Sequence, residues 1–354
     1  MKAAYKPNRE KGIKIIDVPI PKISENEVLV KIKKAAICGT DIHLYDWNNW
    51  CENVNAKNPM IIGHEFCGEV VEVGSNVTLV KTGDLIAGET HIPCGKCILC
   101  RTGRQHICKD MKILGVHTDG VFAEYAKIPE ICAWKLHPDT PPEIGAIYEP
   151  FGIAVHGVLR DKIAGLSTVI IGAGPIGLFA ANVANISGAS QIFVVDLNEY
   201  RLKLAAKMGD NIVTLNPKKD NVANIIREKT DGRGADVVIE LSGSVQGTRT
   251  GFDVLGKGGR ISLIGLHLEE VPLDLVNNVI YKEAIIYGIT GREMFNSWYQ
   301  TESLIKSEKL NIKKVLTHEF SLDEVEKAIL MAKEGNCGKL IINVEQKIKE
   351  QKSV

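Results

Sequence analysis

Two short segments near the start of the chain carry residue types that bind zinc. Cys38 begins a run that continues through Thr40 to His43, and His64 and Glu65 are adjacent further along. A thiolate, an imidazole and a carboxylate are all ligands that zinc accepts. The hydroxyl of Thr40 lies between Cys38 and His43 in sequence and could pass a proton to the imidazole. The pattern indicates a zinc-activated alcohol whose carbon-bound hydrogen leaves as a hydride.

Each of these residues, taken alone, has a simpler interpretation. A buried cysteine is more often a small apolar side chain than a ligand, and an isolated histidine is more often a hydrogen-bonded polar group. The combination favours a metal site, and Gly63 permits the kink that adjacent ligands need, because neighbours in a strand point to opposite faces. Glu149, directly before Pro150, is a further carboxylate that could ligate the metal or support its ligands.

A second cluster consists of four cysteines at short spacing. Four thiolates can close a tetrahedron around one zinc ion, which leaves no open position for chemistry. The spacing matches neither ferredoxin pattern, so we favour structural zinc over an iron–sulfur cluster, and chance clustering is the remaining alternative. The predicted ligands of this site are Cys94, Cys97, Cys100 and Cys108.

A glycine-rich turn in the middle of the chain predicts a dinucleotide site. The apolar run 167–171 leads into Gly172, Gly174 and Gly177, and Asp196 follows the next apolar run. A strand, a glycine turn that opens a helix, and a later acid form the full dinucleotide fingerprint. The glycines let the backbone approach a pyrophosphate, which lies at the helix N-terminus. A glycine-rich turn in some other α/β protein is the alternative.

The acid of this fingerprint favours NAD over NADP. Asp196 would bind the ribose hydroxyls of the adenosine half and would repel a 2′-phosphate. Arg201, a helical turn later, could instead cover the adenine. The nicotinamide half is expected at the ends of the late strands, where the candidate contacts are Ile264, Gly265, Leu266, Ile289 and Thr290.

Two domains are needed to position these groups. Short β segments with glycine turns over residues 1–152 predict an irregular, mostly antiparallel β-barrel, which would be the catalytic domain. Strand–helix alternation over 153–293 predicts a doubly wound parallel sheet, so the fold class is α/β. Residues 294–354 are expected to return to the first domain, because the parallel sheet is complete by then. The polar segment 46–59 is expected as a loop, either a lid beside the site or a packed surface excursion.

Composition excludes several classes of partner. The 354 residues contain 43 Lys plus Arg and 43 Asp plus Glu, so the net charge of zero argues against nucleic acid or an anionic membrane. No apolar run approaches the ~18 residues of a membrane span, and the first residues show no signal-peptide core. We therefore expect a cytoplasmic enzyme with a small-molecule substrate. Clustered cysteines in a reducing compartment suggest metal rather than disulfides.

Taken together, the motifs resemble the zinc-dependent medium-chain alcohol dehydrogenase superfamily. The likeness spans nearly the whole chain. Thr40 and the block 288–295 are most similar to the branch that oxidises L-threonine, whereas a polyol enzyme would be expected to have Ser at position 40. Besides the four cysteines, the segments that carry the resemblance are Cys38–His43, Gly63–Phe66, Ile113–Val116, Phe122–Tyr125, Glu149–Gly152, Ala154–His156 and Gly288–Phe295, with Trp298 and Tyr299.

The resemblance implies a GroES-like catalytic barrel and a Rossmann NAD domain. It implies a catalytic zinc on Cys38, His64 and Glu65, with Glu149 in a supporting role, and a second, structural zinc on the four cysteines. It also implies a proton relay through Thr40 and His43, an NAD contact at Ile176, and a homotetramer. Two alternatives stay open: a polyol or vicinal-diol dehydrogenase with the same zinc and NAD, and a non-catalytic zinc- and nucleotide-binding module.

Overall fold

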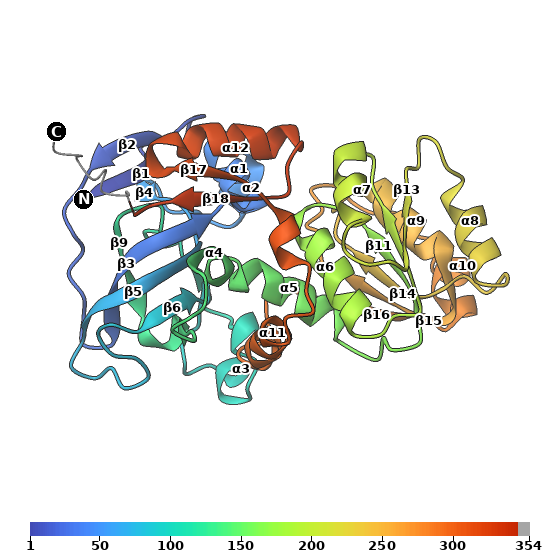
Figure 1. Ribbon diagram of the computed structural model, residues 1–354, viewed down its shortest axis with the longest axis horizontal. Helices are drawn as coiled ribbons and strands as arrows, with labels where there is room; N and C mark the ends of the chain where they lie inside the picture. The colour runs from blue at the N-terminus through green and yellow to red at the C-terminus, as the bar shows by residue number, and fades with distance from the viewer. Residues whose placement is uncertain (346–354) are drawn as a thin grey trace, which may run out of the picture.

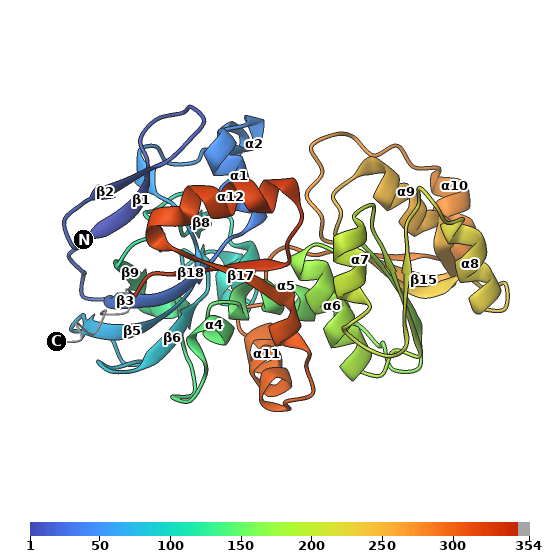
Figure 2. The same ribbon diagram turned by 45° about the horizontal axis from the view of Figure 1, so that its top comes forward.

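The computed structural model describes residues 1–345 and consists of two lobes side by side (Figure 1). The first lobe holds the blue, cyan and red parts of the chain, and the second holds the yellow-green to orange parts. Helices α5 (Tyr148–Val158) and α11 (Asn296–Lys306) lie in the region where the lobes meet. The second view shows α5 beside α6 (Pro175–Ile186), which begins the second lobe (Figure 2).

The first lobe is built around a seven-stranded sheet. Its strands follow the order β10-β6-β5-β3-β18-β17, and β9 pairs with β3 outside this path. All pairings are antiparallel except that of β17 with β18. Strand β18 places Ile341 opposite Ala36 of β3, so a late segment completes an early sheet. The strands are β3 (Glu27–Ala36), β5 (Glu65–Val73), β6 (Leu85–Gly88), β9 (Tyr125–Pro129), β10 (Ala133–Lys135), β17 (Leu316–Ser321) and β18 (Lys339–Asn343).

Smaller elements close this lobe around the main sheet. A three-stranded sheet has the order β2-β1-β4, and β7 pairs with β8. These strands are β1 (Lys2–Lys6), β2 (Lys14–Asp17), β4 (Met60–Ile61), β7 (His91–Ile92) and β8 (Lys112–Ile113). The helices are α1 (Gly39–Asp46), α2 (Asn49–Asn53), α3 (Ile98–Arg101), α4 (Pro142–Gly145) and α12 (Val325–Glu334), with 3-10 turns η1 (Gln105–Ile107), η2 (Glu130–Cys132), η4 (Ile312–Val315) and η5 (Leu322–Glu324).

The second lobe is a six-stranded parallel sheet in the order β13-β12-β11-β14-β15-β16. This order is that of a doubly wound dinucleotide-binding fold. The central strand β11 is buried along its whole length, in agreement with the β-branched apolar residues that follow its first two positions. The strands are β11 (Ser167–Ile171), β12 (Gln191–Val195), β13 (Ile212–Leu215), β14 (Ala235–Glu240), β15 (Leu255–Leu263) and β16 (Ile285–Gly288). The remaining helices are α7 (Glu199–Ala205), α8 (Val222–Lys229), α9 (Val245–Val254) and α10 (Leu275–Asn278), with the turn η3 (Ile280–Lys282).

One apolar core runs without interruption between the lobes. Phe151 of α5 meets Phe179 of α6 edge to face, with 5.6 Å between the ring centroids. The same cluster of buried residues includes Ala36 of β3 and Ile170 of β11. Helix α5 therefore fixes the first lobe, which carries the predicted metal ligands, against the lobe with the glycine-rich turn.

The predicted fold class is confirmed, and one local expectation was wrong. The polar segment 46–59 contains the short helix α2 instead of being a loop throughout. Asn48 caps this helix, because its side-chain oxygen accepts the backbone N–H of Trp50. The domain boundaries after residues 152 and 293 stay a prediction, and the part of the tail beyond residue 345 lies outside the described residues.

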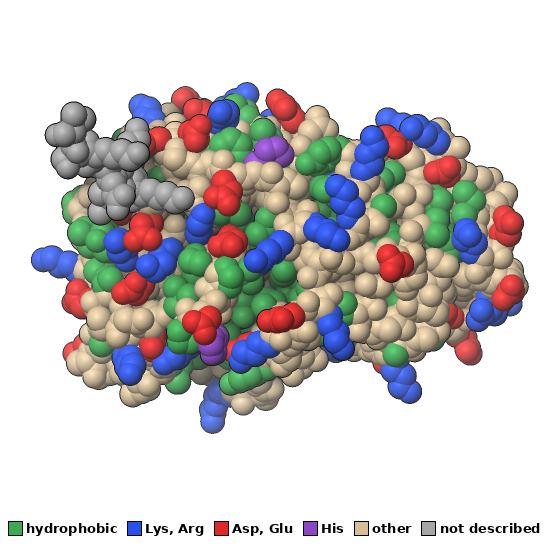
Figure 3. Space-filling model, in the orientation of Figure 1, with side chains coloured by type: hydrophobic (Ala, Val, Ile, Leu, Met, Phe, Trp, Pro, Cys, Tyr) green, Lys and Arg blue, Asp and Glu red, His purple; other side chains and the backbone are tan. Residues whose placement is uncertain are grey.

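Figure 3 shows one face of the molecule, on which both acidic and basic side chains are present over each lobe. This distribution agrees with the equal numbers of acidic and basic residues. Within residues 1–345, no helix combines the length and the apolar character needed to cross a membrane.

Candidate active site and metal centres

The three predicted catalytic ligands come together in the first lobe. Cys38 precedes α1, His64 precedes β5, and Glu65 is the first residue of β5. Their possible ligand atoms all lie within 4.8 Å of one another. Gly63 has φ +91°, and a Cβ at this position would lie 2.3 Å from a ring carbon of Phe122. Glycine is therefore required at the kink that turns two adjacent side chains toward Cys38.

The buried Lys339 lies against Glu65. Its Nζ is 2.6 Å from Oε1 and 2.5 Å from Oε2 of Glu65, and it donates to the Ile37 carbonyl at 2.7 Å. Burial raises the pKa of the Cys38 thiol and of the Glu65 carboxyl, while Lys339 favours their charged forms. Nδ1 of His64 is buried and has no hydrogen-bond partner among residues 1–345. A thiolate, a carboxylate and an imidazole with an unused nitrogen fit a zinc ion.

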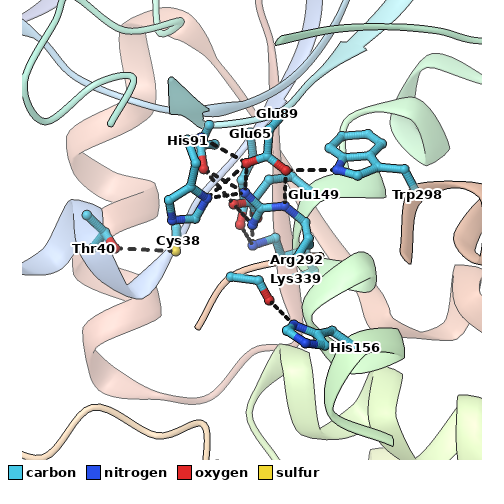
Figure 4. A network of polar contacts seen from close by, with 12 residues as sticks. Cys38, Thr40, Glu65, Glu89, His91, Glu149, His156, Arg292, Trp298 and Lys339 are labelled. Carbon is cyan, nitrogen blue, oxygen red and sulfur yellow. Dashed lines mark hydrogen bonds and ion pairs between the residues drawn. The ribbon is translucent and has the colours of Figure 1, made fainter. Parts of the chain in front are cut away.

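A second charged network surrounds Arg292 (Figure 4). This fully buried guanidinium donates from Nε to Glu89 at 2.9 Å and from Nη1 to Glu149 at 2.5 Å. Glu89 also accepts from Trp298 Nε1 at 2.8 Å and lies 2.9 Å from His91 Nδ1. Burial alone would raise the pKa of Glu89, but Arg292 and His91 hold it well below its usual value. Oε2 of Glu149 remains buried and without a partner in the described part of the chain, so one oxygen of this carboxylate is free for a further contact.

The two predicted relay residues occupy helix α1. The Cys38 thiol donates weakly to Thr40 Oγ1 at 3.8 Å, which places this hydroxyl beside the metal ligands. The His43 ring is stacked on Trp50 with 5.4 Å between centroids, and its Nδ1 is 2.7 Å from Asn48 Nδ2. Burial lowers the pKa of His43. Within the described structure, no hydrogen bond joins Thr40 to His43, so a relay between them would need a bridging group.

The four cysteines form a compact cluster. Their sulfurs lie within 4.8 Å of one another, and Cys97 Sγ is 3.5 Å from that of Cys100 and 3.8 Å from that of Cys108. A regular tetrahedron with Zn–S bonds of about 2.3 Å has edges of about 3.8 Å. Backbone N–H groups of Cys94 and Asp110 point at Cys108 Sγ, at 3.3 and 3.4 Å. The cluster therefore fits a zinc ion held by thiolates.

The glycine turn has the shape of a dinucleotide cradle. Gly172 has φ +99°, and a Cβ at Gly177 would lie 1.9 Å from the Gly172 carbonyl oxygen, so no side chain fits there. Gly174 is the N-cap of α6. At the end of β12, Asp196 accepts the backbone N–H of Ala173 at 2.6 Å and thus stands beside the turn. A cavity of about 300 Å³ opens here, lined by Gly172, Asp196, Leu197, Pro217, Ser242 and Gln246 among others.

Comparison with known proteins assigns the chain to a family. Residues 24–138 match the alcohol dehydrogenase GroES-like domain, and residues 175–307 match the zinc-binding dehydrogenases. L-threonine 3-dehydrogenase of Caldanaerobacter subterraneus is 46% identical over 343 residues, which cover 97% of this chain and 98% of that protein. The enzyme of the same name from Bacillus subtilis is 44% identical, with coverages of 97% and 98%. The chain belongs to the zinc-dependent alcohol dehydrogenase family.

Solved structures of similar fold agree with the assignment of this chain to the family. Alcohol dehydrogenase TADH from Thermus sp. ATN1 aligns with a TM-score of 0.87 at 26% identity and covers 98% of this chain and 100% of its own. The 2R,3R-butanediol dehydrogenase from Bacillus subtilis aligns with a TM-score of 0.86 at 28% identity, covering 97% and 99%. The predicted superfamily is confirmed, and the protein is an NAD-dependent zinc dehydrogenase.

Arg201 of the dehydrogenase lies beside the glycine turn and also contacts the other lobe. A Cβ at Gly174 would be 4.0 Å from Arg201 Nη1, and one at Gly335, the C-cap of α12, would be 3.4 Å from Nη2. Asn198, which caps the helix of Arg201, donates to the Gly335 carbonyl at 3.2 Å. The guanidinium of Arg201 therefore lies close to both the glycine turn and the end of α12, and its predicted contact with the adenine stays a prediction.

The residues predicted near the nicotinamide half lie at the ends of β15 and β16. The backbone N–H groups of Ile264 and Gly265 donate to the Glu240 carbonyl, and that of Ile289 donates to Leu263. Ile289 is buried, whereas Leu266 and Thr290 are exposed. Ile176, in the first turn of α6, is partly buried against the core that joins the lobes. These residues of the dehydrogenase line one edge of the parallel sheet, and the described structure alone assigns them no ligand.

Sequence reasoning missed the charged residues that surround the predicted ligands. Lys339, Glu89 and Arg292 are all buried, although their residue types are usually exposed. Two signals were available. Lys339 directly precedes three apolar residues in the predicted final strand, and Arg292 lies within the block 288–295 that carries part of the family resemblance. Neither signal indicates which residue forms the ion pair, because the partners of Lys339 and Arg292 are far away in sequence.

Proposed function

We propose that this dehydrogenase oxidises L-threonine at its 3-hydroxyl, with NAD⁺ as the hydride acceptor, to give 2-amino-3-ketobutyrate and NADH. The observation that carries the proposal is the convergence of Cys38, His64 and Glu65 within 4.8 Å in a chain whose second lobe has a dinucleotide cradle. The substrate is supported by the relatives, because eight proteins of 42–46% identity carry the name L-threonine 3-dehydrogenase.

The catalytic zinc is assigned to Cys38, His64 and Glu65. When bound, such an ion acts as a Lewis acid that lowers the pKa of a coordinated hydroxyl. Lys339 favours the charged form of Glu65 and orients its carboxylate through two short contacts. Glu149 is held by Arg292 through one oxygen, and its free oxygen faces the same buried region, so it supports the centre either as an occasional ligand or as an acceptor.

Proton removal is assigned to Thr40 and His43. Thr40 Oγ1 lies near the Cys38 thiol, where it can take a proton from the substrate hydroxyl. His43 lies on the same helix, is half-buried, and is kept neutral by its surroundings, so it can accept the proton through a bridging hydroxyl or water.

The cofactor contacts are assigned to the glycine turn with the start of α6, to Asp196 and Arg201, and to the ends of β15 and β16. NAD⁺ when bound supplies the hydride acceptor. The glycine turn accommodates the pyrophosphate, and Asp196 offers a carboxylate for the adenosine ribose at the mouth of the cavity of about 300 Å³. The full set is Gly172, Gly174, Ile176, Gly177, Asp196, Arg201, Ile264, Gly265, Leu266, Ile289 and Thr290.

The remaining assignments concern metal content, assembly and location. The cluster of Cys94, Cys97, Cys100 and Cys108 holds a structural zinc, which makes two zinc ions per chain. We also propose a homotetramer, which the family resemblance implies. The last strand of the parallel sheet, β16, offers one candidate contact between two copies, because its Ile285 and Ile286 are 46% and 42% exposed. An apolar unpaired edge favours pairing with a second copy, and light scattering in solution tests the state. A cytoplasmic location agrees with nine free cysteines.

Formation of NADH, followed by absorbance, tests the proposed reaction. The zinc-loaded protein is mixed with NAD⁺ and, in separate assays, with L-threonine, sorbitol or 2,3-butanediol. Turnover with L-threonine alone supports the proposal. Turnover with only a diol would favour the second candidate function, a vicinal-diol dehydrogenase, which the likeness to the butanediol dehydrogenase supports at lower identity. Absence of turnover with all three would contradict the assigned catalytic centre.

A further inference from the structure

His43 is bound by a side chain that no part of the proposed relay includes. The first helix α1 ends at Asp46, the chain turns at Trp47, and Asn48 then caps α2. The amide nitrogen Nδ2 of Asn48 lies 2.7 Å from Nδ1 of His43. The turn thus brings an uncharged amide against one of the two nitrogens of the predicted proton acceptor.

The orientation of this amide is fixed by the helix that it caps. The oxygen and nitrogen of an asparagine side chain must be assigned from their partners. Here the backbone N–H of Trp50 points at Oδ1 of Asn48, with 3.1 Å between nitrogen and oxygen. A donor requires an acceptor, so this atom is the oxygen, and the group facing His43 is the NH₂. Asn48 therefore donates a hydrogen bond to His43 Nδ1.

A donor at Nδ1 determines the state of the imidazole. The lone pair of Nδ1 is occupied, so the neutral ring carries its hydrogen on Nε2. A cationic ring would carry hydrogens on both nitrogens, and Nδ1–H would then meet the NH₂ of Asn48. Burial lowers the pKa of His43 further, and stacking on Trp50 holds the plane of the ring.

The charged groups around the ring do not reverse this preference. Asp46 favours the cationic form of His43, but its carboxylate lies 2.6 Å from Lys333 Nζ of α12. Glu52 of α2 is engaged by Trp47 Nε1 at 2.7 Å and forms an ion pair with an arginine. Cys51, also of α2, donates its thiol to the His43 carbonyl, and burial raises the pKa of this thiol, so it stays uncharged.

We propose that Asn48 is a positioning residue that holds His43 neutral, with its hydrogen on Nε2 and its lone pair on Nδ1. The inference rests on the proposed function in so far as His43 accepts a proton there. Because Nε2 is already protonated, the ring can take up a proton only on Nδ1. Proton uptake then requires the Asn48 amide to turn away, which also removes the acceptor from the Trp50 N–H. Asn48 thus couples the relay to the cap of α2.

Three variants separate the role of Asn48 from simple capping. Asp and Ser are as good as Asn at a helix N-cap, so α2 persists in Asn48→Asp and Asn48→Ser. Asp replaces the donor with a carboxylate that accepts from Nδ1–H, and Ser removes the donor without adding a charge. The matched control is Asn53→Asp, which makes the same charge change at the exposed end of the same helix.

The first readout is the protonation state of His43 and needs no substrate. Solid-state ¹⁵N NMR of protein labelled in histidine, assigned by the signals lost in His43→Gln, reports which ring nitrogen carries hydrogen. Wild type and Asn53→Asp should show Nε2–H with a bare Nδ1 at neutral pH. Asn48→Asp should show Nδ1–H, and Asn48→Ser should show a mixture. A wild-type ring that is cationic, or that carries its hydrogen on Nδ1, would overturn the proposal.

The second readout is the pH dependence of NADH formation. The base must be unprotonated to accept a proton, so a raised pKa moves the acidic limb of the profile to higher pH. Asn48→Asp should move this limb up by about one pH unit, the effect of a nearby opposite charge, and Asn48→Ser by less. A limb that moves equally in Asn53→Asp would refute the specific role of Asn48. If the enzyme turns over a diol instead of L-threonine, the same profile is recorded with the diol, and the NMR result is unaffected.

Discussion

The two proposed metal centres of this dehydrogenase are built in opposite ways. The four-cysteine cluster lies within residues 94–108, and all of its possible ligands are thiols. The centre of Cys38, His64 and Glu65 mixes three ligand types and is neutralised by Lys339, which enters from β18. A closed, local set of identical ligands suits a structural ion, whereas an open set supported from distant segments suits chemistry. Sequence spacing alone therefore identifies the first kind of site completely. For the second kind it indicates the ligands but not the charged residues that support them.

Removal of one catalytic ligand should give the largest effect on activity. In His64→Ala, the buried centre loses the imidazole, and we expect turnover to fall by about a thousand-fold, since Lewis-acid stabilisation contributes several kcal/mol. Metal analysis should find one zinc per chain instead of two, with the midpoint of thermal unfolding close to that of wild type. Retention of both zinc ions and of most activity would contradict the assignment of this centre.

The cysteine cluster should respond in the reverse manner. Cys108→Ser removes a ligand from a site that closes its own loop, and loss of a structural metal is among the largest single-residue effects on stability. We expect the free energy of unfolding to fall by about 4 kcal/mol, measured by urea denaturation followed by tryptophan fluorescence. Residual turnover per folded molecule should remain. If Cys108→Ser unfolds like wild type while its turnover disappears, the structural role assigned to the four-cysteine cluster is wrong.

A substitution of Arg292 tests whether the region around Cys38, His64 and Glu65 depends on charges that are distant in sequence. Arg292→Leu leaves Glu89 and Glu149 buried without their cation, which should cost about 3 kcal/mol of stability. In wild type the pKa of Glu89 is depressed, so the ionised carboxylate stabilises the fold at neutral pH, and this stabilisation is lost only in strong acid. In the variant the folded carboxyls prefer their protonated form. The loss should therefore grow as pH rises above the ordinary carboxyl value of about 4.3.

Urea unfolding at pH 5 and pH 8 measures this trend in Arg292→Leu. Arg292→Lys serves as the control, because it keeps the charge but not the fork that donates to both carboxylates. We expect a smaller loss of stability in the lysine variant, with little dependence on pH. Equal losses in the two variants at both pH values would show that packing, and not charge, explains the role of Arg292.

The smallest expected effect is that of a substitution at Asp196. Like the four cysteines, this residue was assigned its role from a pattern that is local in sequence. Asp196→Asn keeps an acceptor for the backbone N–H of Ala173 but removes the negative charge. We expect about ten-fold weaker NAD binding, the value of one charged hydrogen bond, and relatively better binding of NADP. Fluorescence titration with both cofactors measures this, and Asp210→Asn, an exposed site, is the control. Unchanged affinity for both cofactors would contradict the assignment of Asp196 as a cofactor contact.

Much of the architecture followed from patterns that are short in sequence. The strand-type run at 167–171, the glycines after it and Asp196 predicted the doubly wound parallel lobe. Gly63 explained how His64 and Glu65 could face one ligand partner. Lys339 was not predicted because a buried ion pair is defined by a partner 274 residues away, and periodicity carries no such information. The helix α2 was missed because its capping Asn48 lies in a segment rich in turn residues.

The pairing of Lys339 with Glu65 also sets the order in which the enzyme can be completed during synthesis. All three proposed zinc ligands leave the ribosome early, within the first 65 residues. Lys339, which pairs with Glu65, follows it by 274 residues, and the same strand β18 completes the sheet beside β3. A nascent chain stopped before β18 would hold every ligand and still lack the finished pocket, so each molecule of the enzyme becomes competent only after β18 has been translated.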